Sequence, residues 1–376
     1  MQQTIDDCKK DGIKFTDMDF DLSNEKGIHS CVLVDDSQDR EEVDLSSITW
    51  PEKGIRLPEI IGEDFEVFST GATPCDICQG EVGTCFFLSA LSIVASHPGL
   101  LEQLLVLHDK NVGLYAFRFF IDGEWELVVI DDYIPCIKDE DVGMYKPCYA
   151  TSRNKREVWV MLFEKAYAKL YNGYQGVDGG FTDKALMELT GGVALKTAKV
   201  QDLGWTQFVK RWERGELFNV AINPKDEEEE EGDGEEKEED GDGEEDEEEG
   251  DGEEDEEGGE YEEEGEGEGE EEEKVEEDEE GGHSKAMTEE TAGKGLFSGH
   301  AYAVLRCVVY KGIRLVQIRN PWGEGEWTGP WSDTSTEWTE EAKREIGHEC
   351  KVTLCSLLLS IFSLYNLIKQ QLTSSG

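Results

Sequence analysis

Basic residues are scarce in this sequence: 35 Lys and Arg stand against 88 Asp and Glu, and the formal net charge is −53. Residues 226–280 alone hold 40 acidic side chains and two lysines. Nucleic-acid binding needs Lys and Arg to replace the counterions of the phosphates. The acidic balance therefore excludes nucleic acid as a partner.

Long apolar runs are also missing. The N-terminal residues MQQTIDDCKKDGIKF contain no apolar stretch of signal-peptide length, so we do not expect secretion. Without a signal, the ten cysteines are expected to be reduced thiols of a cytoplasmic protein. Residues 352–368 carry no charge, but polar residues interrupt them, and a spanning helix needs about 20 mainly apolar residues. We expect an amphipathic or poorly packed helix there, with membrane contact through this tail as the alternative.

Residues 226–280 consist almost entirely of Glu, Asp and Gly. Like charges repel and little apolar surface is available, so this tract is predicted to be a disordered acidic insertion. Its loose D-G-x-x repeats lack the ligand spacing of an EF-hand. Weak collection of calcium by charge alone remains an alternative.

The rest of the chain divides into blocks of different composition. We predict a loosely structured lead-in over 1–65 with a strand-like run at 32–34, a first lobe over 66–200, a second lobe over 201–345 interrupted by 226–280, and an apolar, divergent tail over 346–376.

Periodicity and turn residues predict both helices and antiparallel strands. Alternating runs flank Asp122-Gly123 and Lys311-Gly312, which indicates two hairpins. Residues 157–171 have the apolar spacing of a helix that stops at Asn172-Gly173. The sequence therefore predicts an α+β fold.

Cys85 lies where the polar, glycine-spaced turn QGEVGT meets an apolar helical run. A helix N-terminus carries partial positive charge and unpaired N–H groups, so a thiolate is favoured there. Gly80 and Gly83 are expected to allow a tight turn and to leave space for a substrate. A buried cysteine that only fills space is the alternative.

A nucleophilic cysteine needs a base, and the base needs an orienting partner. His300 opens one predicted strand and Asn320 closes the next. Antiparallel partners have position numbers that add to a constant, about 623 for a turn at Lys311-Gly312, and these two add to 620. We therefore expect the imidazole and the amide to lie side by side.

Three segments resemble the calpains, papain-like cysteine endopeptidases that calcium activates. They are QGEVGTCFFLSA at 79–90, GLFSGHAYAVL at 295–305 and IRNPWGEGEWTGPWSD at 318–333. The resemblance covers roughly residues 14–340 apart from the insertion. It implies a two-lobed protease core, with a helical lobe that carries the nucleophile and an antiparallel β lobe.

The resemblance also implies roles for individual residues. Cys85, His300 and Asn320 would form a triad across a cleft, and Gln79 would complete the oxyanion hole. Trp322 would shield the His–Asn bond from water. The implied activity is limited, calcium-dependent proteolysis of protein substrates.

Calcium ligands follow from the same resemblance. In the first lobe they would be the carbonyls of Ser69 and Gly71 with the carboxylates of Asp76 and Glu157, and in the second lobe Glu326 and Asp333. Oxygen ligands suit Ca²⁺. Bound calcium is expected to reorient the two lobes until Cys85 comes within reach of His300.

The sequence departs from the family in several places. Thr84 and Phe86 stand where calpains usually have Asp and Trp. After residue 347 we find no counterpart of the strand that completes the second lobe in the family, so the chain looks truncated, unless the apolar tail fills the space. A catalytically silent regulatory or binding protein is therefore the alternative function. A zinc or redox site at Cys75 and Cys78 is a third alternative, which rests on a single CxxC without the second ligand pair that a zinc site needs.

Overall fold

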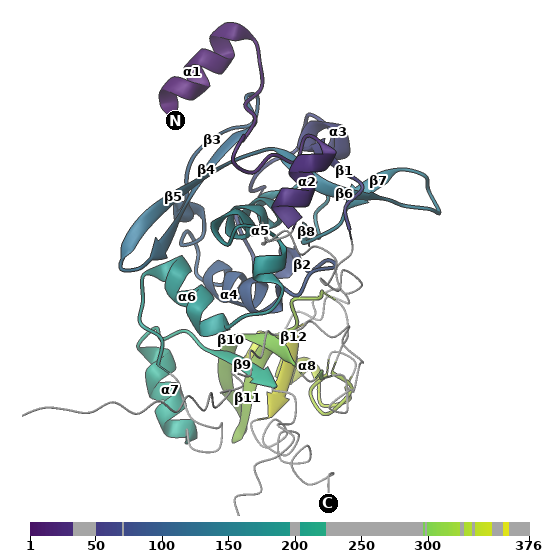
Figure 1. Cartoon of the computed structure of the whole chain (residues 1–376). Coiled ribbons are helices and arrows are strands. Elements are labelled where there is room, and N and C mark those ends of the chain that lie inside the picture. The colour runs from purple at the N-terminus through teal and green to yellow at the C-terminus, as the bar shows by residue number, and fades with distance from the viewer. Residues whose placement is uncertain are drawn as a thin grey trace, which may run out of the picture. The chain divides into compact units, whose positions relative to one another are not determined.

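The computed structural model describes residues 1–32, 50–69, 71–195, 204–222, 296–297, 299–323, 327–332, 335–347 and 356–360. These residues form helices and small sheets in which neighbouring strands are antiparallel (Figure 1). The α+β class predicted from the sequence is thus confirmed. The acidic tract at 226–280 lies outside the described residues.

The described residues of the predicted lead-in, 1–32 and 50–65, contain four regular elements. They are α1 (Gln2–Asp11), α2 (Glu25–Val32), β1 (Lys53–Arg56) and α3 (Leu57–Ile61). Val32 was expected to begin a strand, but it ends α2 and is fully buried. That expectation was wrong because the apolar residues of this segment line one helix face: Ile28, Cys31 and Val32 all enter the main core.

The main core of the first part of the chain lies between three helices and a sheet. The helices are α4 (Cys85–Ala95), α5 (Trp159–Leu170) and α6 (Thr182–Thr190), and the sheet is β3 (Leu105–Asp109), β4 (Leu114–Ile121) and β5 (Glu124–Asp131). Asp122 and Gly123 both have positive φ, as a two-residue hairpin turn requires, so this predicted hairpin is confirmed.

Smaller elements complete this part. Two further sheets have the orders β1-β6-β7 and β2-β8, where β2 is Ile77–Cys78, β6 is Tyr133–Lys138, β7 is Tyr145–Pro147 and β8 is Thr151–Ser152. Single 3-10 turns occur at Pro74–Asp76, Glu102–Leu104 and Gln175–Val177.

A second group of elements packs around its own apolar residues, among them Tyr302, Val316 and Trp327. Its sheet has the order β12-β11-β10-β9, with β9 at Asn219–Ile222, β10 at His300–Tyr310, β11 at Ile313–Arg319 and β12 at Ser356–Ser360, and its helices are α7 (Trp205–Glu213) and α8 (Glu340–Ile346). Lys311 and Gly312 have positive φ and join β10 to β11, which confirms the second hairpin.

The apolar tail contributes a strand to this sheet. Ser356–Ser360 forms β12 and pairs antiparallel with β11, from Leu315↔Ser360 to Arg319↔Ser356. A helix was expected over 352–368, but its described part, 356–360, is a strand. The alternative that the apolar tail fills the open place in the second lobe agrees with this pairing. None of the described helices is long and apolar enough to cross a bilayer.

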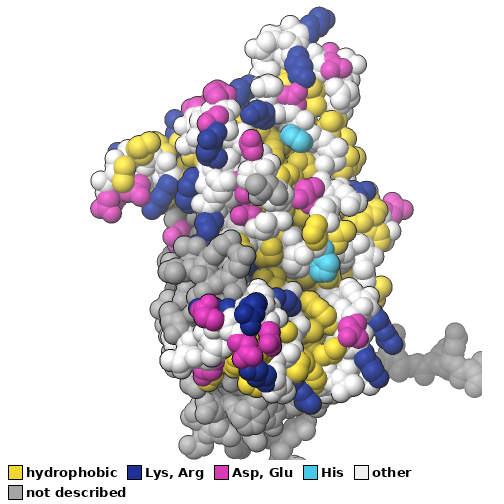
Figure 2. Space-filling view, turned by 180° about the vertical axis from the view of Figure 1, so that it is seen from behind, with side chains coloured by type: hydrophobic (Ala, Val, Ile, Leu, Met, Phe, Trp, Pro, Cys, Tyr) yellow, Lys and Arg dark blue, Asp and Glu magenta, His cyan; other side chains and the backbone are white. Residues whose placement is uncertain are grey.

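Charges of both signs mix on the described surface. Figure 2 shows Lys and Arg side chains interspersed with Asp and Glu and with apolar side chains on one face. This distribution agrees with a charge imbalance that is concentrated in residues 226–280 of the sequence.

Candidate active site

The helix α4 begins at Cys85, as the sequence predicts, and each of its residues is buried. The turn before it is tightly packed. A Cβ on Gly80 would lie 2.4 Å from backbone atoms of Tyr149, and one on Gly83 would lie 2.5 Å from Oδ1 of Asp178. Glycine is therefore required here because other groups approach closely, and the expected open space for a substrate is not what these two positions provide.

Burial raises the pKa of the Cys85 thiol, and the charge of Asp178 adds to the increase. Hydrogen bonding from the backbone of Ala301, Phe86 and Cys85 itself lowers this pKa by a smaller amount. The expectation that the helix N-terminus alone favours the thiolate was wrong for this arrangement, because Cys85 is only 8% exposed.

His300 and Asn320 lie side by side, as the strand register predicts. His300 Nε2 is 2.7 Å from Asn320 Oδ1, and both residues are buried. The backbone N–H of Trp322 also donates to Oδ1, at 3.0 Å, which identifies that atom as the carbonyl oxygen. Nε2 must then carry the proton, so Nδ1 has the lone pair of the neutral imidazole.

The free nitrogen of His300 is the one that could act as a base. Among the described residues, Nδ1 has no hydrogen-bond partner although it is buried. Burial lowers the pKa of His300 to about 4, against a smaller raising effect of the Asn320 hydrogen bond. The imidazole is therefore neutral at pH 7 and able to accept a proton.

Cys85 and His300 belong to different parts of the fold that touch at this point. Ser89 Oγ on α4 donates to the carbonyl of Ala301, 2.9 Å away, and the residue before Ala301 is His300. Arg319 also reaches across, because its guanidinium donates to the carbonyl of Ile77 at 2.7 Å. The sulfur thus lies against the backbone that carries the imidazole.

Gln79 and Trp322 also lie at this junction. The backbone N–H of Gln79 donates to the carbonyl of Pro321 at 3.0 Å, and its Nε2 donates to the carbonyl of Val82 at 3.0 Å. The ring centroid of Trp322 is 4.4 Å from that of His300, so the indole covers one face of the imidazole.

Two of the first-lobe residues proposed for calcium, Ser69 and Asp76, lie near Glu157, whereas Gly71 lies by Glu102. Glu157 Oε1 accepts from the backbone N–H of Ser69 at 2.8 Å, and the pKa of Glu157 is raised first by burial and also by the nearby charge of Asp76. Asp76 accepts from Thr73, and Gly71 has a φ of 92°. Within the described ranges there is no group of three or more His, Cys, Asp or Glu side chains that could hold a metal. Glu326 and Asp333 lie outside these ranges.

Two carboxylates next to the nucleophile were not anticipated from the sequence. Asp178 Oδ1 accepts from the backbone N–H of Gly83 at 2.7 Å, and Glu164 Oε1 accepts from the hydroxyl of Thr84 at 2.6 Å. The sequence could have indicated a buried carboxylate at Glu164, because this charged residue lies on the apolar face of the helix predicted at 157–171.

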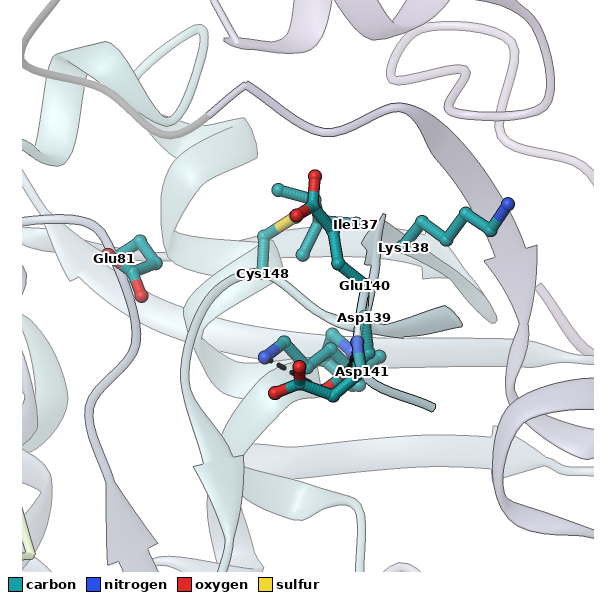
Figure 3. A pocket seen from close by; sticks show the side chains of 9 residues that line it. Glu81, Ile137, Lys138, Asp139, Glu140, Asp141 and Cys148 are labelled. Atoms are coloured by element: carbon teal, nitrogen blue, oxygen red, sulfur yellow. Dashed lines mark hydrogen bonds and ion pairs between the residues drawn. The ribbon is translucent and has the colours of Figure 1, made fainter. Parts of the chain in front are cut away.

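The surface pocket in Figure 3 is separate from these residues. It has a volume of about 370 Å³ and is lined by Glu81, Cys148 and the β6–β7 hairpin. Its acidic side chains are partly engaged, since Asp139 forms an ion pair with Lys146 at 3.2 Å and accepts from the backbone of Asp141 and Val142. Neither Cys85, His300 nor Asn320 lines this pocket.

Comparison with known proteins agrees with this geometry. Residues 15–353 match the family described as "Calpain family cysteine protease". The chain belongs to the calpain family. It is 35% identical over 292 residues to the "Calpain-type cysteine protease DEK1" of Arabidopsis thaliana, 29% identical over 361 residues to "Calpain-9" of Rattus norvegicus and 28% identical over 350 residues to the "Calpain-1 catalytic subunit" of Mus musculus.

The matches to these calpains cover different shares of the two chains. They include 75%, 92% and 88% of this chain but only 10%, 41% and 40% of the three relatives. The sequence thus corresponds to less than half of each relative, and its protease fold is the part that they share.

Proposed function

We propose that this calpain-family protein is a calcium-dependent cysteine endopeptidase that makes limited cuts in protein substrates through Cys85, His300 and Asn320. The observation that carries the proposal is the 2.7 Å bond between His300 Nε2 and Asn320 Oδ1. It leaves Nδ1 of His300 as the acceptor, beside the backbone that donates to the sulfur of Cys85.

The chemistry follows from these atoms. His300 Nδ1 takes the thiol proton of Cys85, and the sulfur attacks the substrate carbonyl. The N–H of Cys85 and the amide of Gln79 stabilise the oxyanion. His300 then gives its proton to the leaving amine, and the same nitrogen takes a proton from the water that hydrolyses the thioester. Asn320 keeps the imidazole in the required tautomer throughout.

Calcium dependence is proposed from the kind of atoms around Glu157. The carbonyls of Ser69 and Gly71 and the carboxylates of Asp76 and Glu157 are all oxygen donors, which fits Ca²⁺. Burial and the charge of Asp76 raise the pKa of Glu157, and a cation between these two carboxylates would relieve the repulsion of their charges. Bound calcium would supply positive charge to this pair. Glu326 and Asp333 remain proposed ligands of a second site.

A catalytically silent regulatory protein is the second candidate. It is favoured by the pKa directions, since burial raises the pKa of Cys85 and lowers that of His300, so the thiolate–imidazolium pair is disfavoured. In either case we propose a cytoplasmic protein, in keeping with the free thiols of the described cysteines. Contact of the tail with a membrane remains a minor proposal.

Cleavage of casein distinguishes the two candidates. The full chain with millimolar calcium is expected to cut casein, and Cys85→Ala or a chelator is expected to abolish the cleavage. Cleavage that persists in Cys85→Ala would exclude Cys85 as the nucleophile. A variant lacking 226–280 should still bind calcium, and Glu157→Ala should weaken that binding. Loss of all binding on removal of the tract would contradict the assignment of the core site.

A further inference from the structure

Glu164 is a buried carboxylate that the proposed reaction does not use. It lies on α5 and is 1% exposed. Its Oε1 accepts from the hydroxyl of Thr84 at 2.6 Å, and its Oε2 accepts from the backbone N–H of Ala150 at 2.8 Å. Both donors are neutral, so a charge here is held by hydrogen bonds alone, which is an expensive arrangement in a dry interior.

Thr84 occupies the N-cap position of α4 but does not cap it. A threonine at this position usually has extended backbone and accepts a hydrogen bond from the second or third N–H of the helix. Here the side chain makes no capping bond, and φ and ψ are −82° and 17°. The hydroxyl is instead used as a donor to Glu164.

Two N–H groups at the start of α4 act on the nucleophile. Burial raises the pKa of Cys85, and hydrogen bonding from the backbone of Phe86 and of Cys85 itself, the first two residues of α4, lowers it in part. If Thr84 capped the helix through the second N–H group, its oxygen would compete with the sulfur for the N–H of Phe86. The conformation of Thr84 therefore decides whether that N–H acts on the sulfur or on the hydroxyl oxygen.

We propose that Glu164 is a positioning residue for Cys85: its carboxylate holds the hydroxyl of Thr84 away from the start of α4, so that the N–H of Phe86 remains available to the sulfur. The inference rests on the proposed role of Cys85 as the nucleophile. It adds a residue that touches neither substrate nor sulfur and acts only through Thr84.

A second carboxylate holds the same turn from another side. Asp178 Oδ1 accepts from the N–H of Gly83, and the N–H of Gly179 donates to the carbonyl of Gly83 at 3.0 Å. The residues directly before Cys85 are thus each bound to an acidic side chain. Asp178 fixes the backbone, whereas Glu164 fixes the one side chain that could cap the helix.

The charge state of Glu164 is part of this arrangement. Burial raises its pKa to about 7, against the lowering effect of its two hydrogen bonds. Among the described residues, the charge of Glu164 acts on Tyr149 and Tyr174, and the charge of Asp178 also acts on Tyr149. A proton on Glu164 weakens the charge-assisted bond to Thr84.

The test measures the alkylation rate of Cys85 by iodoacetamide in the full chain at neutral pH, with the modified cysteine mapped. Glu164→Met, which removes both acceptor oxygens, is expected to slow the reaction about tenfold, since a lost N–H bond raises the thiol pKa by about one unit. Thr84→Val should react at close to the wild-type rate, and adding Thr84→Val to Glu164→Met should restore that rate, because no hydroxyl remains to cap α4.

Two further variants complete the design. Glu164→Gln, with one acceptor oxygen for two donors, should react at an intermediate rate, and it replaces the Met variant if that protein does not fold. Glu188→Gln is the matched control: Glu188 is also buried but accepts from the hydroxyl of Tyr167 at 2.7 Å rather than from Thr84, so its replacement should leave the rate unchanged.

Three outcomes would overturn the inference: an unchanged rate in Glu164→Met, a slow double variant, or a slow Thr84→Val. Casein cleavage measured in parallel separates this inference from the proposed function. Rescue of alkylation without proteolysis would support the role of Glu164 and reject the protease. Proteolysis by the wild type without rescue of alkylation in the double variant would support the protease and reject the role of Glu164.

Discussion

The imidazole of His300 and the side-chain amide of Asn320 are joined at 2.7 Å, and the oxygen that accepts from the ring also accepts from the backbone of Trp322. The amide therefore cannot rotate without losing two bonds. This fixes the tautomer of His300 and with it the nitrogen that is left to act as a base.

Removal of the amide should affect turnover more than substrate binding. Asn320→Ala is expected to lower kcat by about tenfold to a hundredfold, because a hydrogen bond to the charged imidazolium is lost. KM should change little. Trp322→Phe is the control, since it keeps an apolar ring over His300, and its kcat should fall much less. An equal loss in both variants would assign the effect to packing rather than to the amide.

The stability of the protein should depend on pH through His300. Its pKa is about 4 in the folded state and about 6.5 when unfolded, so the unfolded chain binds the extra proton in this range. The free energy of unfolding should therefore fall by about 3 kcal/mol as the pH drops from 6.5 to 4. Denaturation of His300→Gln should lack this slope, whereas His97→Gln should retain it.

Glu164 should produce the opposite slope. Its pKa is about 7 in the folded state, above the usual value of 4.5, so the folded protein keeps a proton that the unfolded chain loses. This stabilisation is present below pH 4.5 and is lost as the pH rises through 7, by about 3 kcal/mol. The stability of Glu164→Gln relative to the wild type should thus increase over this range. A constant difference would mean that Glu164 does not titrate there.

The turn before the nucleophile should tolerate no added methyl group. Gly83→Ala would place Cβ 2.5 Å from the carboxylate of Asp178, so we expect a loss of about 1–3 kcal/mol in unfolding free energy and slower alkylation of Cys85. Gly204→Ala is a matched control, because nothing lies within 4 Å of its added Cβ. Similar losses in both would contradict the packing argument.

The tail should stabilise the second sheet through one strand. Deletion of residues 351–376 removes β12 and leaves unpaired those backbone groups of β11, between Leu315 and Arg319, that face β12. We therefore expect a lower melting temperature and more aggregation. Deletion of 361–376 keeps β12 and should behave like the full chain. Equal melting temperatures for both deletions would show that β12 contributes nothing.

Sequence patterns over a few neighbouring residues correctly predicted the helix start and the hairpins of this fold. The start of α4 at Cys85 and both hairpins follow from turn residues and apolar spacing. The strand register also brought His300 to Asn320, although a bulge after Val304 shifts the pairing by one. These features depend on residues that are close in sequence or paired across one turn.

Features that depend on contacts between residues far apart in the sequence were not predicted. A short apolar run such as the one at β12 fits a helix or a strand equally well, and only an available edge such as that of β11 decides between them. The pKa direction of Cys85 was misjudged because burial by the other part of the fold outweighs the N–H groups. The bond from Thr84 to Glu164 spans 80 positions and depends on how α5 packs.

The pairing of Ile222 with His300 has a consequence for the length of the segment that connects β9 to β10. Both ends of the segment between β9 and β10 are held together by the sheet, whatever the segment contains. For a flexible segment, closure entropy grows only with the logarithm of the residue number, and a tenfold longer connection costs about 2 kcal/mol. A connection between adjacent strands is thus a position where a protease core can gain many residues while its strand register stays the same.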